Sequence, residues 1–186
     1  VGAGWSQSAG VWTLVDGTKT WTFSVATGIL SLVDTGSGST AYDNWAAAKG
    51  LSALNKGPDQ DPDQDGSTNL AEFAFNGNPL NGSDHGQVHI LTTDNDISRK
   101  LILTIAVLAG TPVFSSDDSP TATFAGITYT IQGGTDLSTP AKVNGLASPV
   151  TSGLPGAGNG YEYRSFSLAS SVGLTGKGFL RAKVTQ

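Results

Sequence analysis

Residues Asp61–Glu72 read DPDQDGSTNLAE, and this stretch decides how the rest of the chain is divided. It fits the pattern D-x-[DN]-x-[DN]-G-x5-E, in which oxygen ligands recur at alternate positions of a curled twelve-residue loop. Asp61, Asp63 and Asp65 each offer a carboxylate, and Gly66 allows the sharp turn that the sixth position requires. Because Ca²⁺ takes six to eight hard oxygen ligands, this spacing predicts a calcium loop.

Three further residues complete the predicted ligand set. Ser67 offers its backbone carbonyl, Asn69 binds through its side chain or through water, and Glu72 can chelate with both carboxylate oxygens. The eighth position, usually aliphatic in paired calcium sensors, is Thr68, and the sequence has no second loop of this kind. We therefore expect a lone structural site rather than a sensor. The alternative is a solvated acidic loop without an ion, in which the clustered carboxylates would repel one another.

The charge of the chain is concentrated around this loop. The 186 residues include 15 acidic and 10 basic side chains, for a formal net charge of −5. Asp59 and the four acidic residues of the loop account for that excess, and the remaining acids and bases balance. An acidic chain without a Lys/Arg cluster argues against a nucleic-acid partner. The absence of cysteine excludes disulfides, thiolate metal sites and cysteine nucleophiles.

The first 40 residues are predicted to form a β-region. Val11–Val15 and Thr20–Val25 are expected to pair as a hairpin around Asp16-Gly17, and Ile29–Val33 is a third strand. Residues 34–40 are rich in Gly, Ser and Thr and predict a connector. Trp21 is expected to pack inside, whereas Trp5 and Trp12 are more open to solvent.

Residues 41–82 are predicted to form a helix, the calcium loop and a second helix. Tyr42 and Trp45 recur at helical spacing in the first segment, which Pro58 closes. The second helix spans Asn69–Phe75 and stops at the Asn and Gly residues that follow.

Residues 86–186 return to strands and predict an antiparallel β-sandwich, which makes the protein mainly β. The expected strands are Val88–Leu91, Leu101–Leu108, Thr121–Ile131, Tyr161–Leu168 and Gly178–Thr185, with long loops in Gly133–Gly160. The longest apolar run, Leu101–Leu108, is far shorter than the roughly 18 residues of a membrane span. His85 and His89 are expected to be surface residues.

The run Tyr42–Leu80 resembles a region near the C-terminus of large bacterial secreted proteins of the autotransporter-associated β-strand repeat type. In that region an aromatic-rich helix precedes a D-x-D-x-D-G-x-x-N-x-x-E loop and a short helix that ends at an N-P or D-P turn. The loop is also similar to those of dockerins and thrombospondin type 3 repeats. The resemblance implies an extracellular or cell-surface, non-catalytic module that binds one Ca²⁺ and continues into a β-sandwich.

Two functions are consistent with these features. The first is a structural or assembly protein stabilised by calcium, in its sharpest form a surface fibre whose copies join by strand addition. The alternative is a carbohydrate-binding module of a larger secreted protein, with Trp5, Trp12, Tyr161 and Tyr163 as candidate ligand-binding residues for a polysaccharide. We expect no enzymatic activity, because no nucleophile motif occurs and the loop contains the clustered acids.

Overall fold

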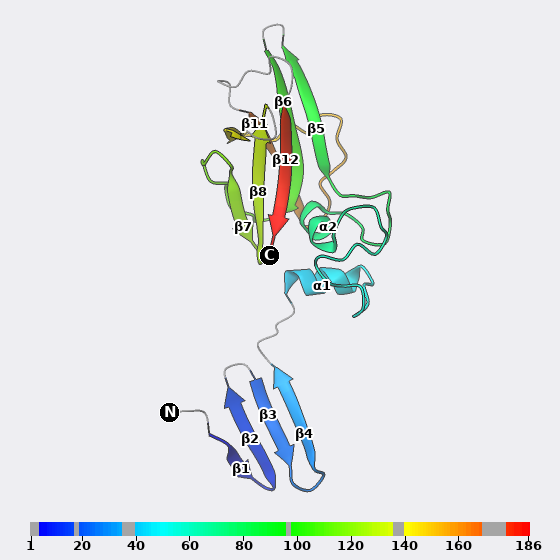
Figure 1. The fold of residues 1–186 in the computed structure, drawn as a ribbon, viewed down its shortest axis with the longest axis vertical. Coiled ribbons are helices and arrows are strands. Elements are labelled where there is room, and N and C mark those ends of the chain that lie inside the picture. Colours follow the sequence, from blue (N-terminus) through cyan, green and yellow to red (C-terminus); the bar gives the residue numbers. More distant parts are fainter. Residues whose placement is uncertain (1–3, 17–18, 35–39, 96–97, 136–139, 169–177) are drawn as a thin grey trace. The chain divides into compact units, whose positions relative to one another are not determined.

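The computed structural model describes residues 4–16, 19–34, 40–95, 98–135, 140–168 and 178–186. This part of the chain is mainly β, with strands in three antiparallel sheets and two helices (Figure 1). The strands are β1 Ser6–Ser8, β2 Val11–Asp16, β3 Lys19–Ser24, β4 Ile29–Asp34, β5 Val88–Asn95, β6 Ser98–Leu108, β7 Thr121–Phe124, β8 Ile127–Gly134, β9 Pro140–Ala141, β10 Val143–Gly145, β11 Tyr161–Leu168 and β12 Phe179–Thr185. The helices are α1 Ala41–Ala48 and α2 Asn69–Phe75, and neither is long enough to span a bilayer. The chain folds into two compact units, residues 1–40 and residues 41–186, which we call the N-terminal unit and the main unit.

The N-terminal unit is a four-stranded antiparallel sheet in the order β1-β2-β3-β4. Its register places Trp12 opposite Phe23, and Phe23 opposite Leu30. Strand β1 was not predicted. The predicted Asp16-Gly17 turn includes residue 17, which lies outside the described residues.

The main unit contains two four-stranded sheets that share one hydrophobic core. The sheet orders are β10-β11-β6-β5 and β12-β8-β7, and β9 also pairs with β8. Strand β8 alternates buried and half-buried side chains, as expected when one face of a strand packs inward. Phe114 connects the two sheets, because its ring centroid lies 4.8 Å from that of Phe166 on β11 and 6.1 Å from that of Tyr129 on β8.

Two predictions for this region were wrong. The segment Thr121–Ile131, expected as one strand, is a hairpin of β7 and β8. Its turn residues Ala125 and Gly126 both have positive φ, at 52° and 83°, which suits the twist of a two-residue hairpin. The segment Gly133–Gly160, expected as loops, contains β9, β10 and the end of β8.

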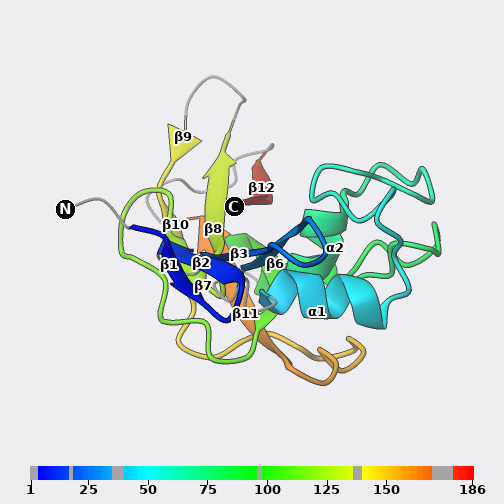
Figure 2. The same ribbon diagram turned by 90° about the horizontal axis from the view of Figure 1, so that it is seen from below.

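The two helices pack together beside the sheets (Figure 2). Tyr42 and Trp45 of α1 contact Phe73 of α2, with ring centroids 5.5 Å apart in both pairs. These rings belong to or pack against the same core as the strands. The helical segment therefore lies in one compact unit with the two sheets.

Candidate metal site

Helix α2 begins at a capped turn directly after the acidic loop. Thr68 has extended backbone angles, and its hydroxyl accepts a hydrogen bond from the Ala71 amide at 3.3 Å. This N-cap satisfies one of the amides that a helix start leaves unpaired. The polar residue at the eighth loop position thus has a structural role, and the cap sets the direction in which α2 carries Glu72.

The three loop aspartates come together. One carboxylate oxygen from each of Asp61, Asp63 and Asp65 can be chosen so that all three lie within 4.8 Å of one another, a group that can hold a metal ion. Asp61 is fixed by the loop backbone, because its two oxygens accept hydrogen bonds from the amides of Asp65 at 3.2 Å and Gly66 at 2.9 Å. Gly66 has a φ of +93°, which glycine adopts without strain. The loop therefore brings together the three aspartates that the sequence pattern predicts as ligands.

Glu72 is more deeply buried than the three aspartates. Its side chain is 0% exposed, and neither carboxylate oxygen has a hydrogen-bond partner. Burial and the nearby negative charges of Asp63, Asp65 and Asp61 raise the pKa of Glu72 to about 8. Glu72 does not join the aspartate group at the 4.8 Å distance, although its charge acts on all three members.

The aspartates respond to the cluster in opposite directions. Burial and the charge of Asp65 raise the pKa of Asp63, whose two oxygens are also buried without partners. Burial acts to raise the pKa of Asp61 as well, but hydrogen bonds from the amides of Gly66, Asp65 and Gln64 bring it below its usual value. Asp61 is therefore the anchored anion, whereas Asp63 and Glu72 favour their protonated forms unless a cation lies beside them.

Asn69 and Ser67, the two remaining predicted ligands, lie within the same loop. The Asn69 side-chain nitrogen donates to the carbonyls of Asn55 and Gly57, both at 2.8 Å, and its buried Oδ1 has no partner. The amide of Ser67 donates to Asp65 Oδ1 at 2.6 Å. Asn69 Oδ1 is thus available as a ligand, and ligation by the Ser67 carbonyl stays a prediction.

A segment after α2 contributes residues that the sequence pattern did not reveal. His85 Nδ1 lies 2.6 Å from Asp65 Oδ2, and Gly82 lies so near that a Cβ there would be 3.4 Å from Asp65 Cβ. Residues 82–85 therefore lie directly beside the aspartate cluster. His85 is exposed, as expected, and no spacing rule within the loop links it to Asp65.

The four aromatic residues considered for polysaccharide binding have different surroundings. Tyr163 is only 8% exposed, and its hydroxyl donates to Pro155 O at 2.9 Å. Tyr161 is half-buried, and its hydroxyl donates to Phe73 O at 2.7 Å. These contacts argue against the two tyrosines as an exposed sugar platform, because a sugar needs a free ring face. Trp5 and Trp12 of the N-terminal unit are exposed.

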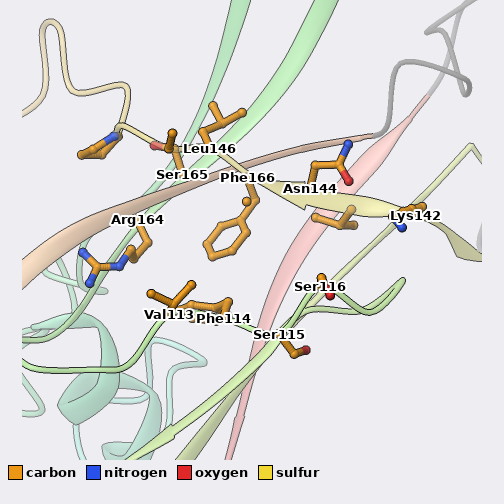
Figure 3. A pocket seen from close by; sticks show the side chains of 14 residues that line it. Val113, Phe114, Ser115, Ser116, Lys142, Asn144, Leu146, Arg164, Ser165 and Phe166 are labelled. Atoms are coloured by element: carbon orange, nitrogen blue, oxygen red, sulfur yellow. The ribbon is translucent and has the colours of Figure 1, made fainter.

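An open groove of about 910 Å³ lies elsewhere on the main unit, between β10, β11 and residues 113–116 (Figure 3). Phe114 and Phe166 line its apolar part, and Lys142 and Arg164 lie toward opposite ends. The Arg164 guanidinium is already paired with Glu162 at 2.7 Å. Of the two cations that line the groove, Arg164 therefore already has an acidic partner. The lining residues do not include a cluster of reactive groups.

Comparison with protein-family models, curated protein sequences and solved structures found no match for this chain.

Proposed function

We propose that the loop Asp61–Glu72 binds one calcium ion, and that the ion stabilises a non-catalytic structural module of an extracellular or cell-surface protein. The observation that carries this proposal is Glu72, a fully buried carboxylate whose two oxygens have no partner. Buried polar groups are normally hydrogen-bonded, and an unpaired buried charge is costly. A cation beside Glu72 would offset that cost and the repulsion among the three aspartates.

The donor set favours calcium over other metals. Three aspartates, the Asn69 side-chain oxygen, the Ser67 carbonyl and a bidentate Glu72 would supply seven oxygens, within the six to eight that Ca²⁺ takes. Mg²⁺ requires a smaller octahedral shell and retains several waters. Softer metals prefer thiolate or imidazole. The chain has no cysteine, and the Nδ1 atom of the nearby His85 already lies 2.6 Å from Asp65 Oδ2.

The position of the loop supports a structural role. The carbonyls of Phe73 and Ala74 in α2 accept hydrogen bonds from Tyr161 of β11 and Tyr129 of β8, at 2.7 and 3.2 Å. An ion held at the start of α2 would therefore fix a helix that is hydrogen-bonded to both sheets. We regard these two sheets as the β-sandwich expected from the sequence. Calcium sites of extracellular modules are often weak, roughly 10⁻⁴–10⁻³ M, because the ion is abundant there.

Calorimetric titration with Ca²⁺ tests this function. We expect one ion per chain for the wild type and an affinity at least about tenfold weaker for Glu72→Gln, which removes a bidentate anion and about 1.4 kcal/mol of binding free energy. The control is Asp59→Asn, which removes an exposed acid just before the loop and should change the affinity far less. No binding at millimolar calcium, or equal losses in both variants, would contradict the proposal.

A further inference from the structure

The side of β5 that faces the core is apolar but open to solvent. Val88 and Ile90 on this strand are 42% and 53% exposed. Their register partners on β6, Ile105 and Leu103, are both 0% exposed and belong to the hydrophobic core. Directly paired residues project from the same side of a sheet. The core-facing side of this sheet is therefore covered at β6 and uncovered at β5.

The facing sheet ends before it reaches β5. Its strand β8 contacts β10 and β11, and the neighbouring β12 contacts β6. Because β12 is an edge strand, the position beside it, over β5, holds no strand in the described part of the chain. Helix α2 contacts β12 and β6 and fills one end of this position, beside the C-terminal end of β12 (Figure 1). We call the free edge of β12, together with Val88 and Ile90, the open edge.

The backbone of β12 can pair with a further strand. Within the described residues, its backbone hydrogen bonds are those with β8, so its other side is unpaired. Such an edge presents amides and carbonyls with which an extended peptide can pair. Every second side chain of a strand added there meets Val88 and Ile90. Apolar side chains at these positions would remove both residues from water.

The outer side of β12 is basic. Arg181 and Lys183 are exposed, whereas Leu180 and Ala182 pack toward the core. Arg181 Nε donates to Gln132 Oε1 at 2.9 Å, and neither cation forms an ion pair with a carboxylate of the described residues. The outward side chains of an added strand lie beside these two cations, and opposite charges on neighbouring strands attract. Acidic residues therefore fit the outward positions.

We propose that the open edge binds an extended segment of another protein in which acidic and apolar residues alternate. The apolar side chains cover Val88 and Ile90, and the acidic side chains pair with Arg181 and Lys183. Successive residues of a strand point to opposite sides, so this alternation satisfies both surfaces at once. Charge complementarity favours this partner over the N-terminal strands of a second copy, which already pair with one another. The proposal goes beyond the calcium site and does not depend on an ion.

Two pairs of variants separate the open edge from the rest of the surface. Ile90→Asp places a carboxylate in the apolar part of the open edge, and Val113→Asp makes the same change at an exposed residue of the groove. Lys183→Glu reverses a charge on β12, and Lys142→Glu reverses one on another exposed lysine of the main unit. Circular dichroism of each variant confirms that the sheets are retained.

Fluorescence anisotropy with a labelled synthetic peptide of alternating valine and glutamate tests the proposal. The full chain should bind this peptide with a dissociation constant below about 1 mM and should not bind a peptide of alternating valine and lysine. Ile90→Asp and Lys183→Glu should each weaken binding at least about fivefold, because each brings a negative charge next to the glutamates. Val113→Asp and Lys142→Glu should bind like the wild type.

Hydrogen exchange gives a second measurement that needs no variant. The valine–glutamate peptide should slow the exchange of the β12 amides that do not bond to β8, because it pairs with them. Exchange in β7, the opposite edge strand of the same sheet, should not change.

Four results would overturn the proposal. The first is no binding of the valine–glutamate peptide by the wild type up to about 1 mM, and the second is equal affinity for the two peptides. Equal weakening by a variant and its control would place the binding elsewhere on the molecule. Protection of all β12 amides in the peptide-free chain would show that another part of the chain covers the edge. Peptide binding is measured in chelator as well as in calcium, so this proposal and the calcium site fail separately.

Discussion

Glu72 combines complete burial with a pKa of about 8, raised from 4.5 by burial and by its acidic neighbours. The folded, ion-free protein thus holds this proton more tightly than the unfolded chain does. The contribution of Glu72 to stability is therefore fully present below about pH 4.5 and is lost as the pH rises toward 8. The raised pKa of Asp63 acts in the same direction, and the lowered pKa of Asp61 acts against it.

Melting curves recorded in chelator at pH 5, 6.5 and 8 test this linkage. We expect the melting temperature to fall across this range, and Glu72→Gln to reduce the fall, because glutamine has no proton to lose. Saturating calcium should also reduce it, since the ion replaces the proton as the partner of the carboxylate. An undiminished pH dependence in Glu72→Gln would show that other groups are responsible.

The aspartate cluster could be predicted from sequence because the loop itself specifies it. Alternate residues of a curled loop point inward, and Gly66 marks the turn, so Asp61, Asp63 and Asp65 needed no tertiary information. The approach of His85 to Asp65 could not be found in this way, because it depends on how residues 82–85 fold back over the loop. The burial of Tyr163 could not be predicted for the same reason, because its hydroxyl donates to Pro155 O in a loop whose position depends on the tertiary fold.

Helix α2 is held at its C-terminal end by strands of both sheets. Tyr161→Phe should remove the 2.7 Å hydrogen bond to Phe73 O and cost about 0.5–1.5 kcal/mol. We expect faster hydrogen exchange of the α2 amides in this variant, because the helix loses one of its attachments. Tyr163→Phe is the control, since its hydroxyl bonds to Gln87 and Pro155 and not to α2. Equal acceleration in both variants would rule out a specific attachment through Tyr161.

The boundaries of α2 were predictable, and those of β7 and β8 were not, for reasons of turn chemistry. Asn76 has a φ of 60° and the Gly77 amide bonds to Glu72 O, so the Asn-Gly signal marks a real helix end. In the β7–β8 turn, Ala125 takes a positive φ of 52°, which alanine rarely adopts. Ala125 therefore gives no turn signal in the sequence, and the alternation after Gly126 led to the prediction of one long strand.

The charged residues are unevenly distributed between the two units of the molecule. Residues 1–40 contain three charged side chains, Asp16, Lys19 and Asp34, whereas the excess of negative charge lies in the loop of the main unit. This division could be read from sequence because composition is local. The order of strands in the two sheets of the main unit could not be read in this way, because β6 pairs with β5 and with the distant β11 through packing that no short pattern encodes.

Thermal unfolding of the full chain with and without calcium tests the central claim most directly. At a calcium concentration one hundred times the dissociation constant, binding to the folded state adds about 2.7 kcal/mol. For a protein of this size, that corresponds to a melting temperature roughly 5–10 °C higher than in chelator. The account predicts this rise for the wild type and a much smaller one for Glu72→Gln. For a dissociation constant of roughly 10⁻⁴–10⁻³ M, that excess requires about 10–100 mM calcium. Identical melting curves in chelator and at about 100 mM calcium would contradict a stabilising calcium site.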